Sequence, residues 1–316
     1  MRCGQYRFSC TFRDEALLPE YKGSTFRGVF GHALKRVVCA LRRRDCADCL
    51  LRDRCLYVFV FETPAPGSPH DEPKPSPFRP YVLSPVPDDR TRYHPGDTFA
   101  FDLLLFGKAN DDLPYFIYAF DQVGQGGIGR KIDGHQARFT LTSVSAGEQS
   151  IFSARDGKVS AGDWTTDLKS DLLTALSAAP EERQSLEIRL LTPLRLKYEN
   201  RLEAGLPFHI LVRAALRRIS MLCNAFGDGE PDLDYRGLVS RARPVRTLAP
   251  DLRWFDWQRY SNRQDQAMLM GGLVGLVNYA GDLGPFLPLL RFCERTHLGK
   301  QTTFGLGKIR IGEANP

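Results

Sequence analysis

The sequence predicts an α+β protein built from two tandem ferredoxin-like domains, and three observations lead to this prediction. The chain has 316 residues, of which 42% are hydrophobic and 25% charged. This composition supplies one large or two medium packed cores and excludes a disordered or fibrous protein. Strand-like and helical hydrophobic periods alternate along the chain. The order strand, helix, two strands, helix, strand occurs twice, which is the βαββαβ plan in duplicate.

The first copy of this plan is predicted for residues 1–145. Its elements are strand 2–13, helix 26–41 capped by Ser24 and Thr25, strand 56–61, strand 98–106, a helix from the cap Asn110-Asp111-Asp112 to Gly124, and strand 137–144. A cysteine-rich knuckle at 39–55 and a proline-rich surface connection at 64–87 are inserted in this domain.

The second copy is predicted for residues 184–316, after a Ser/Ala/Asp-rich linker or insertion at 146–183. Its elements are strand 186–196, helix 208–226, an Arg/Trp/Tyr-rich run at 236–263, strand 271–279, helix 285–296, a glycine loop at 299–307 and strand 308–311.

Basic residues gather in one segment of the first domain. The formal net charge is +6, and the stretch 22–44 has seven basic residues and no acid. They are Lys22, Arg27, Lys35, Arg36, Arg42, Arg43 and Arg44. A run of one sign indicates a polyanion partner such as nucleic acid, with a solvated helix face as the alternative.

No membrane partner is expected, because the most apolar stretch, 268–290, is interrupted by Asn278 and Asp282. The N-terminal residues lack the apolar core of a signal peptide, so we expect a cytoplasmic protein with reduced cysteines.

Both glycine loops imitate nucleotide-binding motifs without meeting their requirements. Gly124, Gly126 and Gly129 match G-x-G-x-x-G, but a helix precedes this loop and a strand follows it, the reverse of a dinucleotide site. Lys300 lacks the glycine that a nucleotide-phosphate loop needs, because Glu294 stands there. Glycines beside basic residues instead suggest that a polyanion approaches the backbone amides, with tight turns as the alternative.

Four of the eight cysteines lie within 17 residues, in the pattern C-x6-C-x2-C-x5-C. They are Cys39, Cys46, Cys49 and Cys55. Four thiolates suit a structural zinc ion, an iron–sulfur cluster uses the same ligands equally well, and incidental thiols are the alternative. The other four sit in apolar patterns and are predicted to be buried thiols: Cys3, Cys10, Cys223 and Cys293.

The segment 297–311, HLGKQTTFGLGKIRI, resembles the C-terminal glycine-rich signature of CRISPR-associated RAMP-superfamily endoribonucleases that process precursor CRISPR RNA. Shorter resemblances lie at 26–34, 126–130 and 256–264, the last typical of a cysteine-containing branch. The resemblance implies two RRM-like domains, a repeat-RNA ligand, and metal-independent cleavage that leaves a 2′,3′-cyclic phosphate and a 5′-hydroxyl.

Cleavage by the RNA's own 2′-hydroxyl needs proton transfer and charge stabilisation rather than a metal. His32 is the first catalytic candidate, because Lys35 and Arg36 lie three and four residues on along the same helix, and the resemblance also points to a histidine in this region. His297 is second and His135 third, and Tyr21 is a weaker candidate for orienting the phosphate. A histidine on a polar face that only binds RNA or solvent is the alternative.

RNA binding is assigned to the basic and glycine positions around these segments. They are Arg27, Gly126, Gly129, Arg130, Lys131, Arg259, Arg263, Gly299, Lys300, Gly305, Gly307 and Lys308. Trp254, Trp257 and Tyr260 suit base stacking and core packing equally. The partners expected are repeat or guide RNA and other CRISPR effector subunits. The alternative function is a non-cleaving RNA-binding subunit of such a complex.

Overall fold

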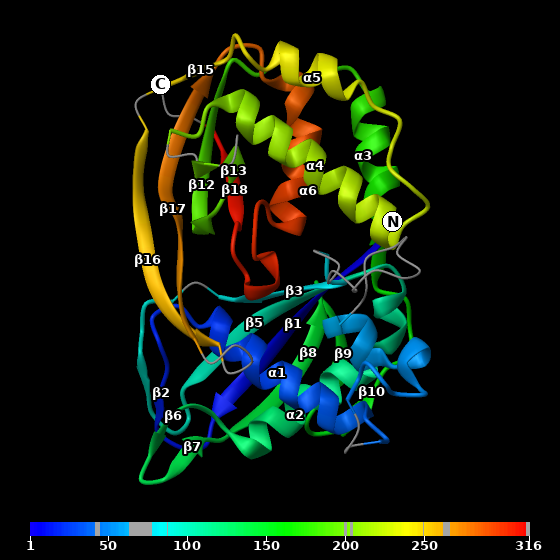
Figure 1. The fold of residues 1–316 in the computed structure, drawn as a ribbon, viewed down its shortest axis with the longest axis vertical. Coiled ribbons are helices and arrows are strands. Elements are labelled where there is room, and N and C mark those ends of the chain that lie inside the picture. Colours follow the sequence, from blue (N-terminus) through cyan, green and yellow to red (C-terminus); the bar gives the residue numbers. More distant parts are fainter. Residues whose placement is uncertain are drawn as a thin grey trace. The chain divides into compact units, whose positions relative to one another are not determined.

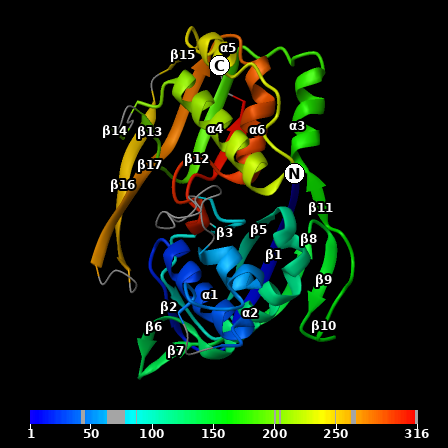
Figure 2. The same ribbon diagram turned by 45° about the vertical axis from the view of Figure 1, so that its right-hand side comes forward.

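The computed structural model describes residues 1–41, 45–62, 78–86, 88–198, 201–202, 205–248, 250–261 and 266–313. The chain divides into a first unit, residues 2–166, and a second unit, Met1 with residues 167–316. Both contain an antiparallel sheet with helices on one face, which confirms the predicted α+β class and the tandem ferredoxin-like domains (Figures 1 and 2). In the described residues, no helix has the length and apolar character needed to cross a membrane.

The first unit follows the βαββαβ order. Its main elements are β1 (Arg2–Phe12), α1 (Gly23–Val38), β3 (Tyr81–Pro85), β5 (Thr98–Phe106), α2 (Leu113–Gly126) and β8 (Phe139–Ala146). The strands lie in the order β8-β1-β5-β3 with antiparallel neighbours, as the ferredoxin-like plan requires. Smaller strands are β2 (Ala16–Leu17), β4 (Arg92–Tyr93), β6 (Ile128–Ile132), β7 (His135–Ala137), β9 (Gln149–Ser153), β10 (Lys158–Val159) and β11 (Thr165–Asp167).

The core of the first unit lies between the sheet and its two helices. Alternate residues of β1 are buried on the helix side, because successive side chains of a strand point to opposite faces. Phe8 stacks on Phe101 with ring centroids 4.9 Å apart, and Phe30 of α1 stacks on Phe120 of α2 at 4.9 Å. These aromatic pairs fix both helices against the sheet.

The second unit repeats the plan. Its main elements are β12 (Ser185–Leu194), α4 (Phe208–Phe226), β16 (Asp251–Ser261), β17 (Gln266–Ala280), α6 (Leu287–Thr296) and β18 (Ile309–Gly312). Strand β17 pairs with β12 and β16, and β12 also pairs with β18, which again places the first strand of the motif in the sheet centre. Additional elements are α3 (Leu168–Ser177), β13 (Lys197–Tyr198), β14 (Arg201–Leu202), α5 (Tyr235–Arg241), β15 (Arg246–Thr247), η4 (Gly284–Phe286) and η5 (Thr302–Phe304).

The second strand of the first unit is not where the sequence predicted it. The apolar run 56–61 is helical: η1 (Arg52–Arg54) is followed by the π-helix η2 (Val58–Glu62). The strand that pairs with β5 is β3, which lies inside the predicted proline-rich connection 64–87. Residues 63–77 and 87 of that connection lie outside the described residues. A short continuous apolar run fits a buried helix turn as well as a strand, which explains the error.

Two other regions differ from the expected elements. Residues 146–183, expected as a linker or insertion, contain β9, β10, β11 and α3, and the boundary between the units falls at 166/167. The run at 236–263 divides into α5, β15 and β16. Local polarity marks these stretches as surface segments, but strand pairing with distant residues decides their structure.

The helix caps also differ from those predicted. Helix α1 begins at Gly23 after Lys22, and Ser24 and Thr25 lie inside it rather than capping it. Helix α2 begins after the 3-10 turn η3 (Gly107–Asp112), and Asp112 makes no side-chain cap bond.

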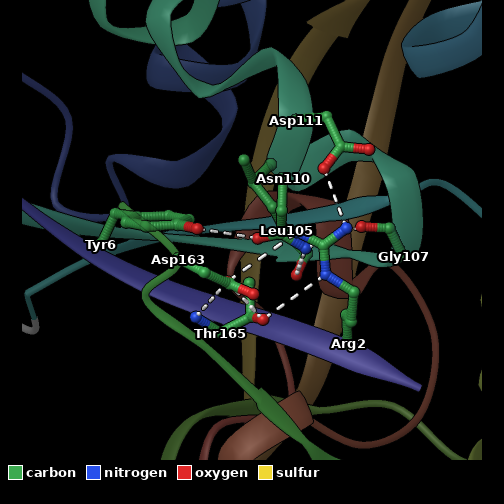
Figure 3. A network of polar contacts seen from close by, with 8 residues as sticks. All are labelled: Arg2, Tyr6, Leu105, Gly107, Asn110, Asp111, Asp163 and Thr165. Atoms are coloured by element: carbon green, nitrogen blue, oxygen red, sulfur yellow. Dashed lines mark hydrogen bonds and ion pairs between the residues drawn. The ribbon is translucent and has the colours of Figure 1, made fainter. Parts of the chain in front are cut away.

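A polar network replaces the predicted cap of α2 (Figure 3). Buried Asn110 donates from Nδ2 to the carbonyl oxygens of Leu105 (3.2 Å) and Gly107 (2.8 Å). Its Oδ1 accepts a 2.9 Å hydrogen bond from the Tyr6 hydroxyl. The guanidinium of Arg2 forms a 2.8 Å ion pair with Asp111. Together these contacts hold the start of α2 against β1 and the end of β5.

Candidate nucleic-acid interface and cleavage site

The exposed face of α1 presents the first catalytic candidate. His32 and Arg36 are exposed and lie one helical turn apart. Gly28, one turn before His32, is also exposed, and a Cβ placed on it would have no atom within 4 Å. In the part of the chain that the structure describes, neither His32 nor Arg36 has a hydrogen-bond or ion-pair partner. This face therefore offers an imidazole and a guanidinium beside an open approach.

Lys35 is on the same helix but is held by neighbours. Its ammonium lies near the Cys46 thiol and 5.2 Å from the centroid of the Tyr57 ring. Burial acts to lower the pKa of Lys35, but the contacts with Cys46 and Tyr57 outweigh burial and raise the pKa. The ammonium stays charged at neutral pH and its position is fixed by the segment that follows α1.

Arg27 and Tyr21 do not share the exposed face with His32. The half-buried guanidinium of Arg27 lies 5.5 Å from the centroid of the Phe61 ring and close to the Tyr81 side chain, so it faces η2 and β3. Tyr21 precedes α1, and His32 is nine residues into that helix, about 13 Å along its axis at 1.5 Å per residue. Burial raises the pKa of Tyr21 above that of an ordinary tyrosine, so its hydroxyl is a poor proton donor at neutral pH.

His297, the second candidate, is inside the second unit. Its side chain is 2% exposed, and Nδ1 lies 3.0 Å from the Leu306 carbonyl oxygen. Burial lowers the pKa of His297 to about 3, so the imidazole is neutral at physiological pH. The Arg218 guanidinium, itself buried, donates to the carbonyl of Thr296 at 2.6 Å and fixes the end of α6 just before this histidine. The geometry is that of a structural histidine shielded from solvent.

The C-terminal glycine loop uses its backbone groups within the fold. Its N–H groups donate to the chain's own acceptors: Lys300 to Arg195 O (3.0 Å), Gly305 to Thr302 O (2.8 Å), Gly307 to Pro193 O (3.0 Å) and Lys308 to Thr192 Oγ1 (2.8 Å). These four amides are therefore not free for a phosphate. The loop presents the side chain of exposed Lys300 and of half-buried Lys308 instead.

The glycines of this loop are required by close packing. A Cβ on Gly299 would lie 2.7 Å from the Arg195 carbonyl oxygen, and one on Gly307 would overlap the carbonyl of Leu298. Gly299, Gly305 and Gly307 all have positive φ, at 84°, 83° and 71°. The expectation that these glycines clear a path for RNA is replaced by a role within the fold.

Thr192 organises the same loop, and the sequence reasoning missed its role. Its buried hydroxyl donates to the Gly305 carbonyl at 2.8 Å and accepts from the Lys308 N–H at 2.8 Å. The sequence signal is a threonine at a position in phase with the apolar residues of an alternating strand, Leu186, Ile188 and Leu190. Such a residue needs a hydrogen-bonding partner when it is buried.

The first glycine loop forms the end of α2 and the β6–β7 hairpin. Gly127 and Gly129 have positive φ, and a Cβ on either would crowd the carbonyl oxygens of Gln136 (2.6 Å) and Leu17 (2.5 Å) respectively. Gly126 is exposed with nothing within 4 Å of a Cβ. Arg130, Lys131 and His135 are all exposed on the hairpin. The hairpin therefore presents cationic side chains on a tightly packed base.

The four clustered cysteines do not gather into a metal site. In the described residues, which include all four and omit 42–44, no three His, Cys, Asp or Glu side chains are placed to hold a metal ion. The zinc and iron–sulfur predictions are therefore not supported. The other four cysteines are buried as free thiols, as predicted. Burial raises the pKa of Cys293 to about 12.

The Arg/Trp/Tyr-rich run is described only in part. The side chains of Trp257, Arg259 and Tyr260, and the whole of Arg263, lie outside the described residues. Trp254 of β16 is exposed, and its indole N–H donates to Asp256 Oδ1 at 2.7 Å.

Two family models match the chain. Residues 1–163, just over half of it, match the AF_1859_N model, described as an N-terminal domain. Residues 188–309 match the model of the CRISPR-associated endoribonuclease Cas6. An uncharacterized protein of Archaeoglobus fulgidus is 25% identical over 296 residues, which cover 93% of this chain and 92% of that protein.

Solved structures share the fold of the whole chain. A chain of a partial Cas6-RT-Cas1–Cas2 complex matches with a TM-score of 0.61 and 14% identity, over 99% of this chain and 46% of that one. The chain thus spans about half the length of that larger chain. The product complex of Thermus thermophilus Cas6 (TTHB231) matches with a TM-score of 0.56 and 15% identity, over 98% of this chain and 100% of that one. Residues 188–309 are therefore a domain of the Cas6 family of CRISPR-associated endoribonucleases, and residues 1–163 match the AF_1859_N model.

Proposed function

We propose that this protein cleaves precursor CRISPR RNA within its repeats by attack of a 2′-hydroxyl on the adjacent phosphate. The products are a 2′,3′-cyclic phosphate and a 5′-hydroxyl. The observation that carries the proposal is the exposed face of α1, where His32 and Arg36 stand one turn apart beside the open position over Gly28. The family match supports processing of CRISPR RNA.

The chemistry assigned to this face is proton transfer with charge stabilisation. The nucleophile is tethered beside the scissile phosphate by the RNA itself, so its proximity is supplied by the substrate. Histidine is the side chain that most often transfers protons in enzymes, so His32 is assigned the proton-transfer step. Arg36 and the permanently charged Lys35 then stabilise the negative charge that builds on the phosphorane. No step in this mechanism is assigned to a metal ion.

RNA binding is assigned to side chains rather than to glycine backbone. In the first unit the β6–β7 hairpin offers Arg130 and Lys131, and in the second unit the glycine loop offers Lys300 and Lys308. Since the loop amides serve the fold, the affinity of these segments for RNA comes from their cations and depends on salt. Repeat RNA is the partner we propose, and association with other CRISPR subunits stays a prediction.

The decisive test is single-turnover cleavage of repeat RNA in EDTA by wild-type protein and by His32→Ala. We expect wild-type cleavage in EDTA, and a loss of about 10²–10⁴ in rate for the variant with binding within a few-fold. His135→Ala is the matched control, because His135 is also exposed but lies on β7. Wild-type rates for His32→Ala would reject the assignment, and tight binding without any cleavage by the wild type would instead support a non-cleaving RNA-binding subunit.

A further inference from the structure

The outer face of α2 carries two exposed tyrosines that the mechanism does not use. Tyr115 is 50% exposed and Tyr118 is 53% exposed, and they lie three residues apart on α2. Residues at this spacing are neighbours on one side of a helix. Among the described residues, the only other exposed aromatic side chain is Trp254 in the second unit. Two large solvent-exposed aromatic rings on one helix indicate an interaction surface for a ligand.

The tyrosines lie beside the proposed cleavage face. Helices α1 and α2 lie side by side on one face of the same sheet (Figures 1 and 2). They pack through Phe30, whose ring centroid is 5.8 Å from that of Phe116 and 4.9 Å from that of Phe120. The buried side of each helix packs on the sheet, whereas His32 of α1 and Tyr118 of α2 are exposed. Both therefore lie on the side of the helix pair that faces away from the sheet. Tyr115 follows one turn closer to the start of α2.

The end of this helix pair that carries Tyr115 is also cationic. The two helices are antiparallel in the ferredoxin-like plan, which brings the last turn of α1 next to the first turn of α2. Lys35 of α1 lies over Tyr57, and Lys108, just before α2, lies 4.4 Å from the centroid of the Phe59 ring. Two rings of one short segment, 57–59, therefore hold an ammonium from each side.

Two carboxylates lie at this end of the helix pair. Asp111 is paired with Arg2 at 2.8 Å (Figure 3), and Asp112 lies close to Lys108. Lys35 and Arg36 in the last turn of α1 are cations in addition to those beside the two acids, so the charge at this end suits a polyanion.

The first turn of α2 is rigid. The contacts of Asn110 with Tyr6, Leu105 and Gly107 fix the backbone immediately before the helix. Tyrosine itself has few rotatable bonds, so both rings are presented at small entropic cost. A ring presented in this way is suited to stack on the flat face of a nucleobase.

We propose that Tyr115 and Tyr118 form a stacking surface for unpaired bases next to the scissile phosphate. This inference rests on the proposed function, because it places the reacting phosphate over α1. The tyrosines act as positioning residues: stacking holds the flanking nucleotides so that the 2′-hydroxyl lies in line with the departing 5′-oxygen at His32. A protein partner would also cover exposed tyrosines, but the cations that border them favour RNA.

The test compares two double variants that differ only in aromaticity. Tyr115→Phe with Tyr118→Phe keeps both rings, whereas Tyr115→Leu with Tyr118→Leu keeps apolar bulk and removes stacking. The probe is repeat RNA that carries 2-aminopurine in turn at each position flanking the cleavage site, because stacking on an aromatic ring quenches this base. Both sites are exposed, so we expect both variants to melt within a few degrees of the wild type.

We expect the wild type and the Phe variant to quench at least one probe position and to cleave at similar rates. The Leu variant should lose that quenching, bind repeat RNA about tenfold or more weakly, and cleave more slowly at saturating protein. Normal quenching and cleavage by the Leu variant would overturn the proposal and assign this face to a protein partner. Failure of the wild type to cleave would reject the proposed function separately, since quenching is measured without cleavage.

Discussion

The buried imidazole of His297 makes the stability of the protein depend on pH. Burial lowers the pKa of His297 to about 3 in the folded protein, whereas an unfolded histidine has a pKa of about 6.5. Below pH 6.5 the unfolded chain therefore binds a proton that the folded chain does not. The free energy of unfolding must decrease as the pH falls from about 6.5 toward about 3, and it is unaffected by this group above that range.

The size of the effect follows from the two pKa values. Each unit of separation corresponds to about 1.4 kcal/mol, and between pH 8 and pH 5 the loss amounts to about 2 kcal/mol. The assay is urea unfolding of the wild type and His297→Asn at these two pH values. Asparagine keeps a short polar side chain at this position, and its amide can donate to the Leu306 carbonyl without titrating.

The difference between the two proteins isolates the histidine. Other titrating groups contribute equally to both, so the wild type should lose about 2 kcal/mol more than His297→Asn between pH 8 and pH 5. Equal losses would refute the reasoning and mean that the ring is accessible to protons in the folded state. At pH 8 the folded variant should cleave RNA like the wild type, and a folded but inactive His297→Asn would return catalysis to this residue.

Two further predictions concern the C-terminal glycine loop. Gly307→Ala should destabilise the protein by about 1–3 kcal/mol or more, because residue 307 has φ 71° and its new Cβ would overlap the Leu298 carbonyl. Gly126→Ala, where a Cβ meets no atom within 4 Å, is the control and should be tolerated. Thermal unfolding of both variants checks this, and an unchanged melting temperature for Gly307→Ala would contradict the packing. Lys300→Ala should weaken binding of all RNAs alike and reduce the salt slope by about 0.7 in a titration across salt concentrations, and an unchanged slope would show that Lys300 contacts no phosphate.

The sequence predicts most of the fold because hydrophobic periods are local. The alternation around Tyr6, Phe8 and Cys10 gives β1, and the apolar spacing in α1 gives the helix that covers it. The same rule fails at 56–61, where an all-apolar run becomes the π-helix η2, and at 81–85, where a strand lies among prolines. In both places pairing with β5, which the local sequence does not encode, decides the outcome.

The parts of the candidate site that depend on local spacing could be predicted from the sequence, and the parts that depend on distant contacts could not. Helical spacing alone places Gly28, His32 and Arg36 on one face, and the structure leaves that face exposed. Whether a glycine clears space for a ligand or for the chain's own backbone depends on which segment packs against it. At Gly129 and Gly299 the neighbour is a carbonyl of the same unit, from residue 17 and residue 195 respectively. The spacing of the four clustered cysteines likewise shows that metal ligands are available, but it does not determine whether their side chains converge on one point.

The proposed cleavage mechanism assigns different roles to the two repeats of the fold. In the second unit, the loop after α6 uses the N–H groups of Lys300, Gly305 and Gly307 and the imidazole of His297 in internal hydrogen bonds. Its contribution to phosphate binding is therefore assigned to the side chains of Lys300 and Lys308. In the first unit, α1 buries its apolar side and leaves His32 and Arg36 in solvent. Side chains in water can exchange protons, whereas a neutral, buried imidazole cannot do so near neutral pH. Proton transfer is therefore expected from the first repeat, and the second repeat contributes charge for binding.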